Sequence, residues 1–248
     1  MGKMPVTDRD QPCGSIRYFA AWDVTCYLLH GSRGDLLIDT GLPMLRKGLA
    51  AWIQDQRVRQ VFLTHAHVDH DSNAAWMQQQ GAKILLSERD RDLRQHYLRQ
   101  PVHPTAKRYL LRNALQLLGG GFWNSPRYEA DVYFTDADAG LLRTYGYDAE
   151  IIPFAGHTLG SCGILSGGVL YCGDAFTALW GKPDITPHAH SIPLMQASLQ
   201  RILEIDPEWL ACGHGLPLRM QDAKPVIQEY LRQHHLPAAN HIGTNIKT

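Results

Sequence analysis

The sequence predicts an α/β fold in which two β-sheets face each other and helices cover their outer sides. Short β-rich runs alternate with stretches of helical apolar spacing in both halves of the 248-residue chain. No internal repeat, low-complexity tract or Pro/Gly linker separates the halves, so we expect one domain spanning residues 1–248. Several of the predicted strands also end in a glycine or threonine followed by a histidine or an aspartate, which indicates a common site.

The first half begins with an antiparallel meander between residues 17 and 39, where the turn signals Trp22-Asp23 and 31–34 separate β-rich runs. Strand and helix patterns then alternate, which is typical of parallel α/β structure. Apolar spacing predicts helices at 43–56 and 71–80, and short apolar runs predict strands at 61–63 and 83–86. Further helical patterns at 88–99 and 105–118 predict a helical insertion over about 88–128, which could serve as a lid or as a wall of the substrate site.

The second half of the chain also contains both strand and helix patterns. Apolar runs predict strands at 132–135, 150–154, 163–165, 169–172 and 209–212. Helical spacing predicts helices at 192–204 and 221–233, followed by a short C-terminal tail from Leu236. The segment 176–192 directly follows one of the candidate site residues, so we expect it to line the pocket.

Charge and composition exclude several classes of function. Lys and Arg number 24 and Asp and Glu number 24, and this balance disfavours a nucleic-acid partner. Apolar runs are far shorter than the roughly 20 residues of a membrane helix, and no signal-peptide core is evident, so we expect a cytoplasmic protein with no membrane partner. The five cysteines are scattered without a C-x-x-C pair, which predicts reduced, mostly buried thiols. A small-molecule substrate is the expected partner, and a homodimer stays open.

Histidine, with 13 copies, is the informative residue type. Directly after the apolar run 61–63, the chain reads Thr64-His65-Ala66-His67-Val68-Asp69-His70, an H-x-H-x-D-H pattern. Alternation along an extended chain sends His65, His67 and Asp69 to one side while His70 turns away. One short loop therefore offers ligands to two neighbouring points.

Three later strands end in a similar way. His157 follows the apolar run 151–155 and a glycine, Asp174 follows 169–172 and a glycine, and His214 follows 209–212 and a glycine. Because strand ends at one edge of a sheet converge, we expect these side chains to meet the H-x-H-x-D-H loop. The sequence therefore predicts a metal site.

In these motifs and their order, residues 24–216 resemble the metallo-β-lactamase superfamily, nearest in ligand pattern to its glyoxalase II and lactonase groups. The resemblance implies a four-layer αββα sandwich. It also implies that His65, His67 and His157 hold a first metal, that Asp69, His70 and His214 hold a second, and that Asp174 bridges them. Asp39, in Leu37-Ile38-Asp39-Thr40-Gly41, matches a recurring Asp-Thr-Gly near the family's site.

Five imidazoles and two carboxylates without a thiolate suit zinc and also admit iron or manganese. We therefore expect two Zn²⁺ ions per chain and a zinc-dependent hydrolase. A hydroxide between the metals would attack the carbonyl of a small thioester, ester or lactone, with Asp69 and Asp174 as the catalytic residues. Tyr171, His188 and His190 are the candidate proton donors.

The sequence departs from particular branches of the superfamily. Zinc β-lactamases commonly carry Cys or Ser at the position of Asp174, and lactonases often carry Tyr at the position of Thr177. The glyoxalase II group usually continues into a basic helical substrate-binding region, whereas 34 residues follow His214, so the sequence does not support a glutathione thioester and leaves a smaller thioester open. Two alternatives remain: a mononuclear iron oxidoreductase resembling persulfide dioxygenases, and a metal-binding module without turnover.

Overall fold

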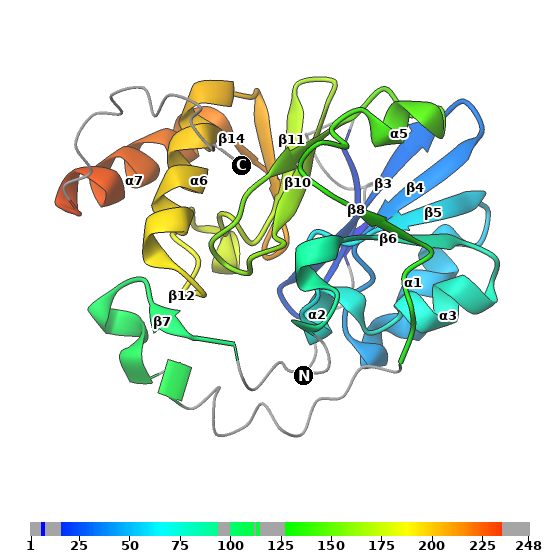
Figure 1. Cartoon of the computed structure of the whole chain (residues 1–248), viewed down its shortest axis with the longest axis horizontal. Coiled ribbons are helices and arrows are strands. Elements are labelled where there is room, and N and C mark those ends of the chain that lie inside the picture. The colour runs from blue at the N-terminus through cyan, green and yellow to red at the C-terminus, as the bar shows by residue number, and fades with distance from the viewer. Residues whose placement is uncertain (1–5, 8–15, 94–99, 112, 115–126, 235–248) are drawn as a thin grey trace, which may run out of the picture.

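Two sheets face each other, with helices on the outer side of each (Figure 1). The computed structural model describes residues 6–7, 16–93, 100–111, 113–114 and 127–234. In Figure 1, α6 and α7 lie against one sheet, and α1 and α3 lie against the other.

The first sheet has seven strands in the order β1-β2-β3-β4-β5-β6-β8. Its bounds are β1 Val6–Thr7, β2 Arg17–Ala21, β3 Val24–Gly31, β4 Gly34–Ile38, β5 Val58–Phe62, β6 Lys83–Ser87 and β8 Val132–Phe134. Strands β2, β3 and β4 pair antiparallel, which confirms the predicted meander. From β4 to β8 the neighbours are parallel, as the alternation of strands and helices predicted.

The second sheet has five strands in the order β14-β13-β11-β10-β9. Its bounds are β9 Glu150–Pro153, β10 Cys162–Ser166, β11 Val169–Gly173, β13 Trp209–Cys212 and β14 Leu218–Arg219. Strands β11 and β13 are parallel neighbours, so their carboxyl ends open on the same edge of the sheet. A separate pair joins β7 (His103–Pro104) to β12 (His188–Ala189).

Of the helices, α1, α6 and α7 follow the predicted segments 43–56, 192–204 and 221–233 closely. The first half contains η2 Pro43–Leu45, α1 Arg46–Ile53, α2 Val68–Asp71, α3 Ala74–Gln79, η3 Glu88–Asp90 and η6 Lys107–Tyr109. The second half contains α5 Leu141–Thr144, η8 Leu179–Gly181, α6 Ile192–Ile205 and α7 Met220–Gln233. Among the described residues, no helix has both the length and the apolar character needed to cross a bilayer.

Three buried apolar clusters correspond to the three interfaces between four layers. The middle cluster joins the inner faces of both sheets, with Tyr18 and Phe62 on one side and Ile164 and Ala211 on the other. The other two clusters join the outer face of the first sheet to α1 and α3, and that of the second sheet to α6 and α7. This arrangement confirms the predicted αββα sandwich.

Some predictions need correction or fall outside the described residues. The helix predicted over 71–80 is the shorter α3, which begins at Ala74, and a separate helix α2 precedes it over the predicted loop, with Ser72 and Asn73 between the two. Of the helical pattern at 88–99, residues 88–90 form the 3₁₀ turn η3 and 94–99 lie outside the described residues, as do 112, 115–126 and the tail from Leu236. The short elements β1, β7, β12, β14 and α5 were not predicted.

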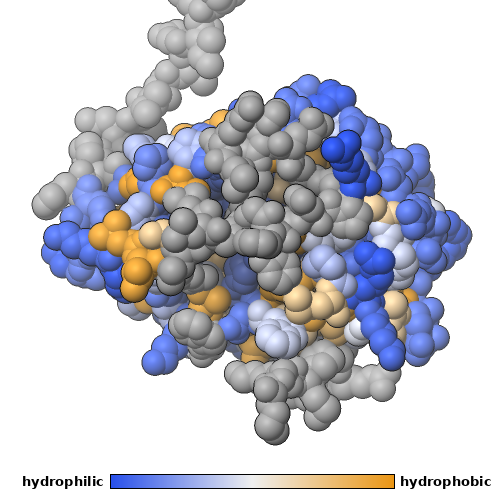
Figure 2. All heavy atoms as spheres, turned by 90° about the horizontal axis from the view of Figure 1, so that it is seen from below, coloured by the Kyte–Doolittle hydropathy of each residue, from blue (hydrophilic) through white to orange (hydrophobic). Residues whose placement is uncertain are grey.

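The surface and the thiols agree with the composition. Figure 2 shows the molecule from below: in this view hydrophilic side chains occupy most of the outline of the described surface, and apolar side chains form small, separate groups. Cys26, Cys162, Cys172 and Cys212 are buried and free, as the sequence predicted for thiols without a pairing motif. The sulfur atoms of Cys172 and Cys212 lie 3.7 Å apart on neighbouring strands.

Candidate metal centre

Four strand ends bring all seven predicted site residues together. The loop after β5 carries His65 and His67, and the short helix α2 that follows it carries Asp69 and His70. The segments after β9, β11 and β13 carry His157, Asp174 and His214. Ligand-type atoms lie within 4.8 Å of one another in three overlapping groups: His65 with His67 and His157, His65 with His70 and Asp174, and Asp69 with His70 and His214. Residues up to 149 positions apart in the sequence thus share one edge of the sandwich.

Two glycines allow the strand ends to approach one another closely. A Cβ atom on Gly213 would lie 2.5 Å from Oδ1 of Asp174 and 2.5 Å from Cε1 of His70. Gly173 has a φ of +51°, and a Cβ there would lie 2.6 Å from Oγ1 of Thr64. The glycine before each of these ligand-type residues therefore has a packing role, because any side chain would displace the site.

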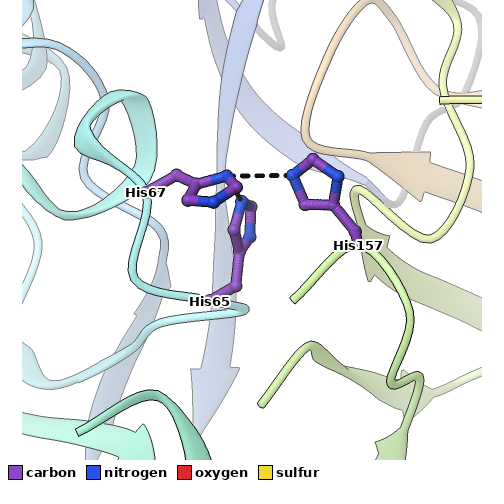
Figure 3. A group of neighbouring side chains, drawn as sticks. All are labelled: His65, His67 and His157. Carbon is purple, nitrogen blue, oxygen red and sulfur yellow. Dashed lines mark hydrogen bonds between the residues drawn. The ribbon is translucent and has the colours of Figure 1, made fainter. Parts of the chain in front are cut away.

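The first donor set consists of three buried imidazoles (Figure 3). Nδ1 of His67 lies 3.1 Å from Nε2 of His65 and 2.9 Å from Nε2 of His157. Burial, together with the neighbouring imidazoles, lowers the pKa of His65 and His157, and burial also lowers the pKa of His67. The three rings are therefore neutral near pH 7, and each has one nitrogen free of hydrogen.

Hydrogen bonds to the ring nitrogens that face away from the cluster show which nitrogen of each ring carries the proton and which is free of hydrogen. Nδ1 of His157 lies 3.0 Å from the backbone oxygen of His188, which can only accept, so the proton is on Nδ1. Thr64 donates its hydroxyl to Oδ2 of Asp39, so its oxygen accepts from Nδ1 of His65 at 3.1 Å. Lone pairs on Nε2 of both rings thus point at the same place, an arrangement that suits a cation.

The second donor set adds carboxylates. Nε2 of His214 lies 3.3 Å from Oδ2 of Asp69 and 3.2 Å from Oδ2 of Asp174. Nε2 of His70 lies 3.6 Å from Oδ1 of Asp174, and Nε2 of His157 lies 3.5 Å from its Oδ2. Asp174 therefore contacts imidazoles of both donor sets, which is the position expected of a bridging ligand.

In the second donor set the carboxylates raise the pKa values of the histidines, whereas the pKa values of the first set are lowered. Burial alone would lower the pKa of His70, but Asp39, Asp174 and Asp69 outweigh burial and raise the pKa to about 9. Burial is likewise outweighed at His214, whose pKa Asp174 and Asp69 raise well above the ordinary value. Burial would raise the pKa of Asp174, yet the imidazoles of His214 and His70 hold it below its usual range. Ionised carboxylates therefore favour positive charge here.

Outer contacts also orient the second set. Nδ1 of His70 donates to Oδ2 of Asp39 at 2.8 Å, and Nδ1 of His214 donates to the backbone oxygen of Asp23 at 2.9 Å. Asp39 thus acts through His70 and Thr64, as the Asp-Thr-Gly resemblance implied. Each of these hydrogen bonds leaves Nε2 facing the other donor atoms.

Two buried polar atoms without a hydrogen-bond partner also indicate that a metal ion fits between the two donor sets. Nε2 of His70 and Oδ1 of Asp174 are buried and have no hydrogen-bond partner within the described structure. Buried polar atoms without a partner are costly, and a metal ion satisfies both an imidazole lone pair and a carboxylate oxygen. The donor set, five imidazoles with two carboxylates, fits a metal site.

The candidate proton donors lie in different environments. Tyr171 packs in the core between the sheets, 5.3 Å from the ring of Tyr27, so its position does not support a role as proton donor. His188 is buried with its ring 4.6 Å from that of His157. The backbone N–H of His190 donates to the backbone oxygen of His157 at 3.1 Å. Of the three, His188 is the one whose side chain the structure places beside the first donor set.

Two residues that contact the site were not predicted. Asp90 accepts from the backbone N–H groups of Ala66 and Gly160 and from Oγ1 of Thr158, so it ties the H-x-H-x-D-H loop to the segment that carries His157. Gln100 contacts both His67 and His157. Both belong to the predicted insertion, where helical spacing was the dominant signal and no motif marked these two positions.

The described part of the insertion docks on the segment that follows Asp174. Oγ1 of Thr105 donates to the backbone oxygen of Thr186 at 2.6 Å, and Nδ2 of Asn113 donates to that of Pro187 at 3.2 Å. Tyr109 donates its hydroxyl to Asp184. The two predicted walls, 88–128 and 176–192, are therefore in contact through their described residues.

A two-sheet sandwich with a histidine- and aspartate-lined edge is the architecture of the metallo-β-lactamase fold. The model of the metallo-β-lactamase superfamily matches residues 20–214, and the chain belongs to this superfamily.

Relatives and solved structures agree. Hydroxyacylglutathione hydrolase of Yersinia pestis is 30% identical over 167 residues, which cover 66% of this chain and 51% of the relative. The chain thus spans about half the length of the curated relatives it matches. A metallo-β-lactamase family protein of Thermus thermophilus superposes with a TM-score of 0.61 at 20% identity, covering 93% of this chain and 77% of that one. A subclass B3 metallo-β-lactamase of Bradyrhizobium japonicum gives a TM-score of 0.60 at 17% identity over 94% and 93% of the two chains. At these identities the two structures show the fold alone.

Proposed function

We propose that this protein is a dinuclear zinc hydrolase in which water attacks the carbonyl carbon of a small thioester, ester or lactone and the acyl C–S or C–O bond is broken. The observation that carries the proposal is Asp174, whose carboxylate contacts His157 of the first donor set and both His70 and His214 of the second. In this proposal His65, His67 and His157 hold one ion, Asp69, His70 and His214 hold the other, and Asp174 is shared.

Two divalent ions held there would supply Lewis acidity, which activates water near neutral pH and polarises a carbonyl oxygen. The chain's own residues determine the direction of approach. The side chain of Asp69 is 30% exposed and that of His214 is 17% exposed, whereas Asp174 is 5% exposed and His70 is fully buried. Substrate and water therefore approach past Asp69 and His214.

Asp69 is well placed to orient a water molecule for the reaction. Burial would raise its pKa, but His70 and His214 lower it well below the ordinary value, so the group is ionised at neutral pH. An ionised, solvent-facing carboxylate accepts a hydrogen bond from a water molecule and orients it. We assign this orienting role to Asp69 in addition to its role as a ligand.

The curated relatives, named hydroxyacylglutathione hydrolases, support a thioester as the substrate class. Because the chain spans about half of their length, the glutathione part of their substrate does not carry over to this chain. Ester and lactone substrates present the same electrophilic carbonyl and stay within the proposal. The β-lactamase structures share the fold, and their substrate is not transferred.

The second donor set favours a dinuclear hydrolase over a mononuclear iron oxidoreductase. Asp69, His70 and His214 form a complete group of ligand atoms separate from the three-histidine set. An iron oxidoreductase with one ion would leave the orphaned Nε2 of His70 without a function. A metal-binding module without turnover differs from the proposal only in catalysis, so activity separates the two.

The test combines metal analysis with a substrate panel. The metal content of the protein is measured by mass spectrometry as purified and again after loading with zinc. The zinc-loaded protein is then assayed on small acyl thioesters, aryl esters, lactones, a β-lactam and a phosphodiester. We expect two Zn²⁺ per chain and turnover of at least one carbonyl substrate. His65→Ala should abolish turnover, whereas His234→Ala, at an exposed histidine beyond α7, should leave it unchanged. One iron per chain, or no turnover on any substrate, would contradict the proposal.

A further inference from the structure

Gln100 connects the predicted insertion to the first donor set. It lies three residues before β7 and its side chain is buried, with 8% exposed. Its Oε1 lies 2.8 Å from Nε2 of His67, and its Nε2 lies 2.8 Å from the backbone oxygen of His157. One amide thus contacts two of the three histidines in Figure 3, which come from opposite halves of the sandwich.

Only one orientation of the Gln100 amide satisfies both hydrogen bonds. The backbone oxygen of His157 can only accept, so the NH₂ group of Gln100 must face it. Oε1 therefore faces His67 and can only accept, so Nε2 of His67 must carry the proton. A metal ion binds the lone pair of a neutral imidazole, so with Nε2 protonated His67 offers Nδ1 to it.

His67 is unusual among the five site imidazoles. His65, His70, His157 and His214 each use Nδ1 for an outer hydrogen bond and turn Nε2 inward. His67 does the reverse, with Nδ1 3.1 Å from Nε2 of His65 and 2.9 Å from Nε2 of His157. An imidazole in water favours neither nitrogen strongly enough to ensure this, so the inward lone pair at His67 depends on what its Nε2 contacts.

We propose that Gln100 is a positioning residue that holds His67 in the Nε2–H tautomer and thereby makes the first metal site depend on the insertion. This inference rests on the proposed function, because it takes the three-histidine set to be a metal site. Gln100 does not contact substrate in this proposal. It acts through His67, and through the backbone of His157 it keeps the two halves of the donor set in register.

The expected effect is on affinity at one site of two. Loss of a side chain that orients a metal-binding histidine typically weakens metal binding by about 10–100-fold. Gln100→Leu removes both hydrogen bonds and should weaken the first site by this factor, while the site of Asp69, His70 and His214 changes by less than about threefold. Gln100→Glu keeps an acceptor for His67 and loses the donor to His157, so it should preserve the tautomer and retain more affinity than Gln100→Leu.

The experiment measures tautomer and affinity separately. Nitrogen NMR of the metal-free protein with labelled histidine reports which ring nitrogen of His67 carries the proton, and loss of the signals in His67→Gln assigns them. Zinc titration against a competing chelator gives the affinity of each site. Gln60→Leu, which removes an amide contact to Tyr147 far from the site, is the matched control.

Each result has a defined meaning. An Nε2–H tautomer at His67 in the wild type, lost in Gln100→Leu together with first-site affinity, supports the inference. An Nδ1–H tautomer in the wild type, or a Gln100→Leu variant with unchanged tautomer and affinity, overturns it even if zinc binds. Failure of the wild type to bind any metal contradicts the proposed function instead, and the tautomer in the metal-free protein still tests the role of Gln100.

Discussion

His70 and Asp174 face each other through two buried atoms, Nε2 and Oδ1, that lie 3.6 Å apart and have no hydrogen-bond partner within the described structure. The residues are 104 positions apart: His70 lies in α2, which follows β5 of the first sheet, and Asp174 directly follows β11 of the second. A sandwich that buries two polar atoms in this way must compensate their lost hydration. In the proposed function a shared cation would provide that compensation, so the stability of this edge and the chemistry of the site would depend on the same pair.

Asp174→Ala should therefore reduce both metal content and hydrolysis. The variant removes the carboxylate that contacts both donor sets, and we expect turnover to fall by at least about 100-fold, the upper end of the loss typical of removing a ligand-orienting partner. Metal analysis and initial rates check this prediction. Asp148→Ala, at an exposed aspartate before β9, is the control and should leave both quantities unchanged. Full metal content and full rate in Asp174→Ala would refute the bridging role.

Asp90→Asn should destabilise the protein without removing a metal ligand. The carboxylate of Asp90 accepts from the N–H groups of Ala66 and Gly160 and from Thr158, at 2.8–3.1 Å. An amide of the same shape turns an NH₂ group toward at least one of these donors, which should cost about 1–3 kcal/mol of unfolding free energy. Urea unfolding of the metal-free protein measures the loss. Asp136→Asn, at an exposed aspartate paired with Arg89, should change it by less than about 0.5 kcal/mol.

Sequence patterns predicted the sandwich and the convergence of strand ends because both depend on local signals. Apolar periodicity defines each strand, and the ligand-type residues His157, Asp174 and His214 directly follow strands of one sheet. The fold then places them at the same edge. The H-x-H-x-D-H loop adds four residues that are adjacent in sequence, so no long-range information was needed to place them with one another.

The contacts that orient the site could not be predicted in this way. His214 donates to the backbone oxygen of Asp23, and a backbone oxygen leaves no mark on residue type. The division between α2 and α3 depends on Asn73, whose side chain donates to the backbone oxygens of Thr40 and Leu42 at 2.8 and 2.9 Å. Elements of two to four residues, such as β7 and α5, are too short for a periodic pattern.

The turn between β2 and β3 should be strained, and relieving the strain should stabilise the protein. Trp22 and Asp23 both have positive φ, +56° and +62°, as a two-residue hairpin turn requires, although Asn-Gly is the favourable pair for such turns. Trp22 is 62% exposed, so little burial is lost on replacement. Trp22→Asn with Asp23→Gly should raise the unfolding free energy by about 1 kcal/mol, since a non-glycine residue in this region costs about 1–3 kcal/mol.

The same double variant should keep its metal content, because His214 contacts the backbone oxygen of position 23 and not its side chain. Urea unfolding and metal analysis of one preparation measure both effects. Asp23→Val is the opposing control: a β-branched residue at positive φ should lower stability. A stabilised variant that loses metal would show that the Trp22 or Asp23 side chain contributes to the site.

Tyr171→Phe should leave hydrolysis unchanged and improve stability in alkali. Tyr171 packs against Tyr27 between the sheets, and burial raises its pKa to about 12 from an ordinary value near 10. Its phenol therefore contributes stability that is fully present below about pH 10 and is lost as the pH rises to about 12, because the unfolded chain ionises first. Phenylalanine keeps the ring contact and lacks this titration.

Relative to the wild type, the Tyr171→Phe variant should gain about 2–3 kcal/mol of unfolding free energy between pH 9 and pH 12. Unfolding in urea at four pH values measures the gain. Equal pH dependence in both proteins would contradict the assigned environment of Tyr171, and a loss of turnover would restore it as a proton donor.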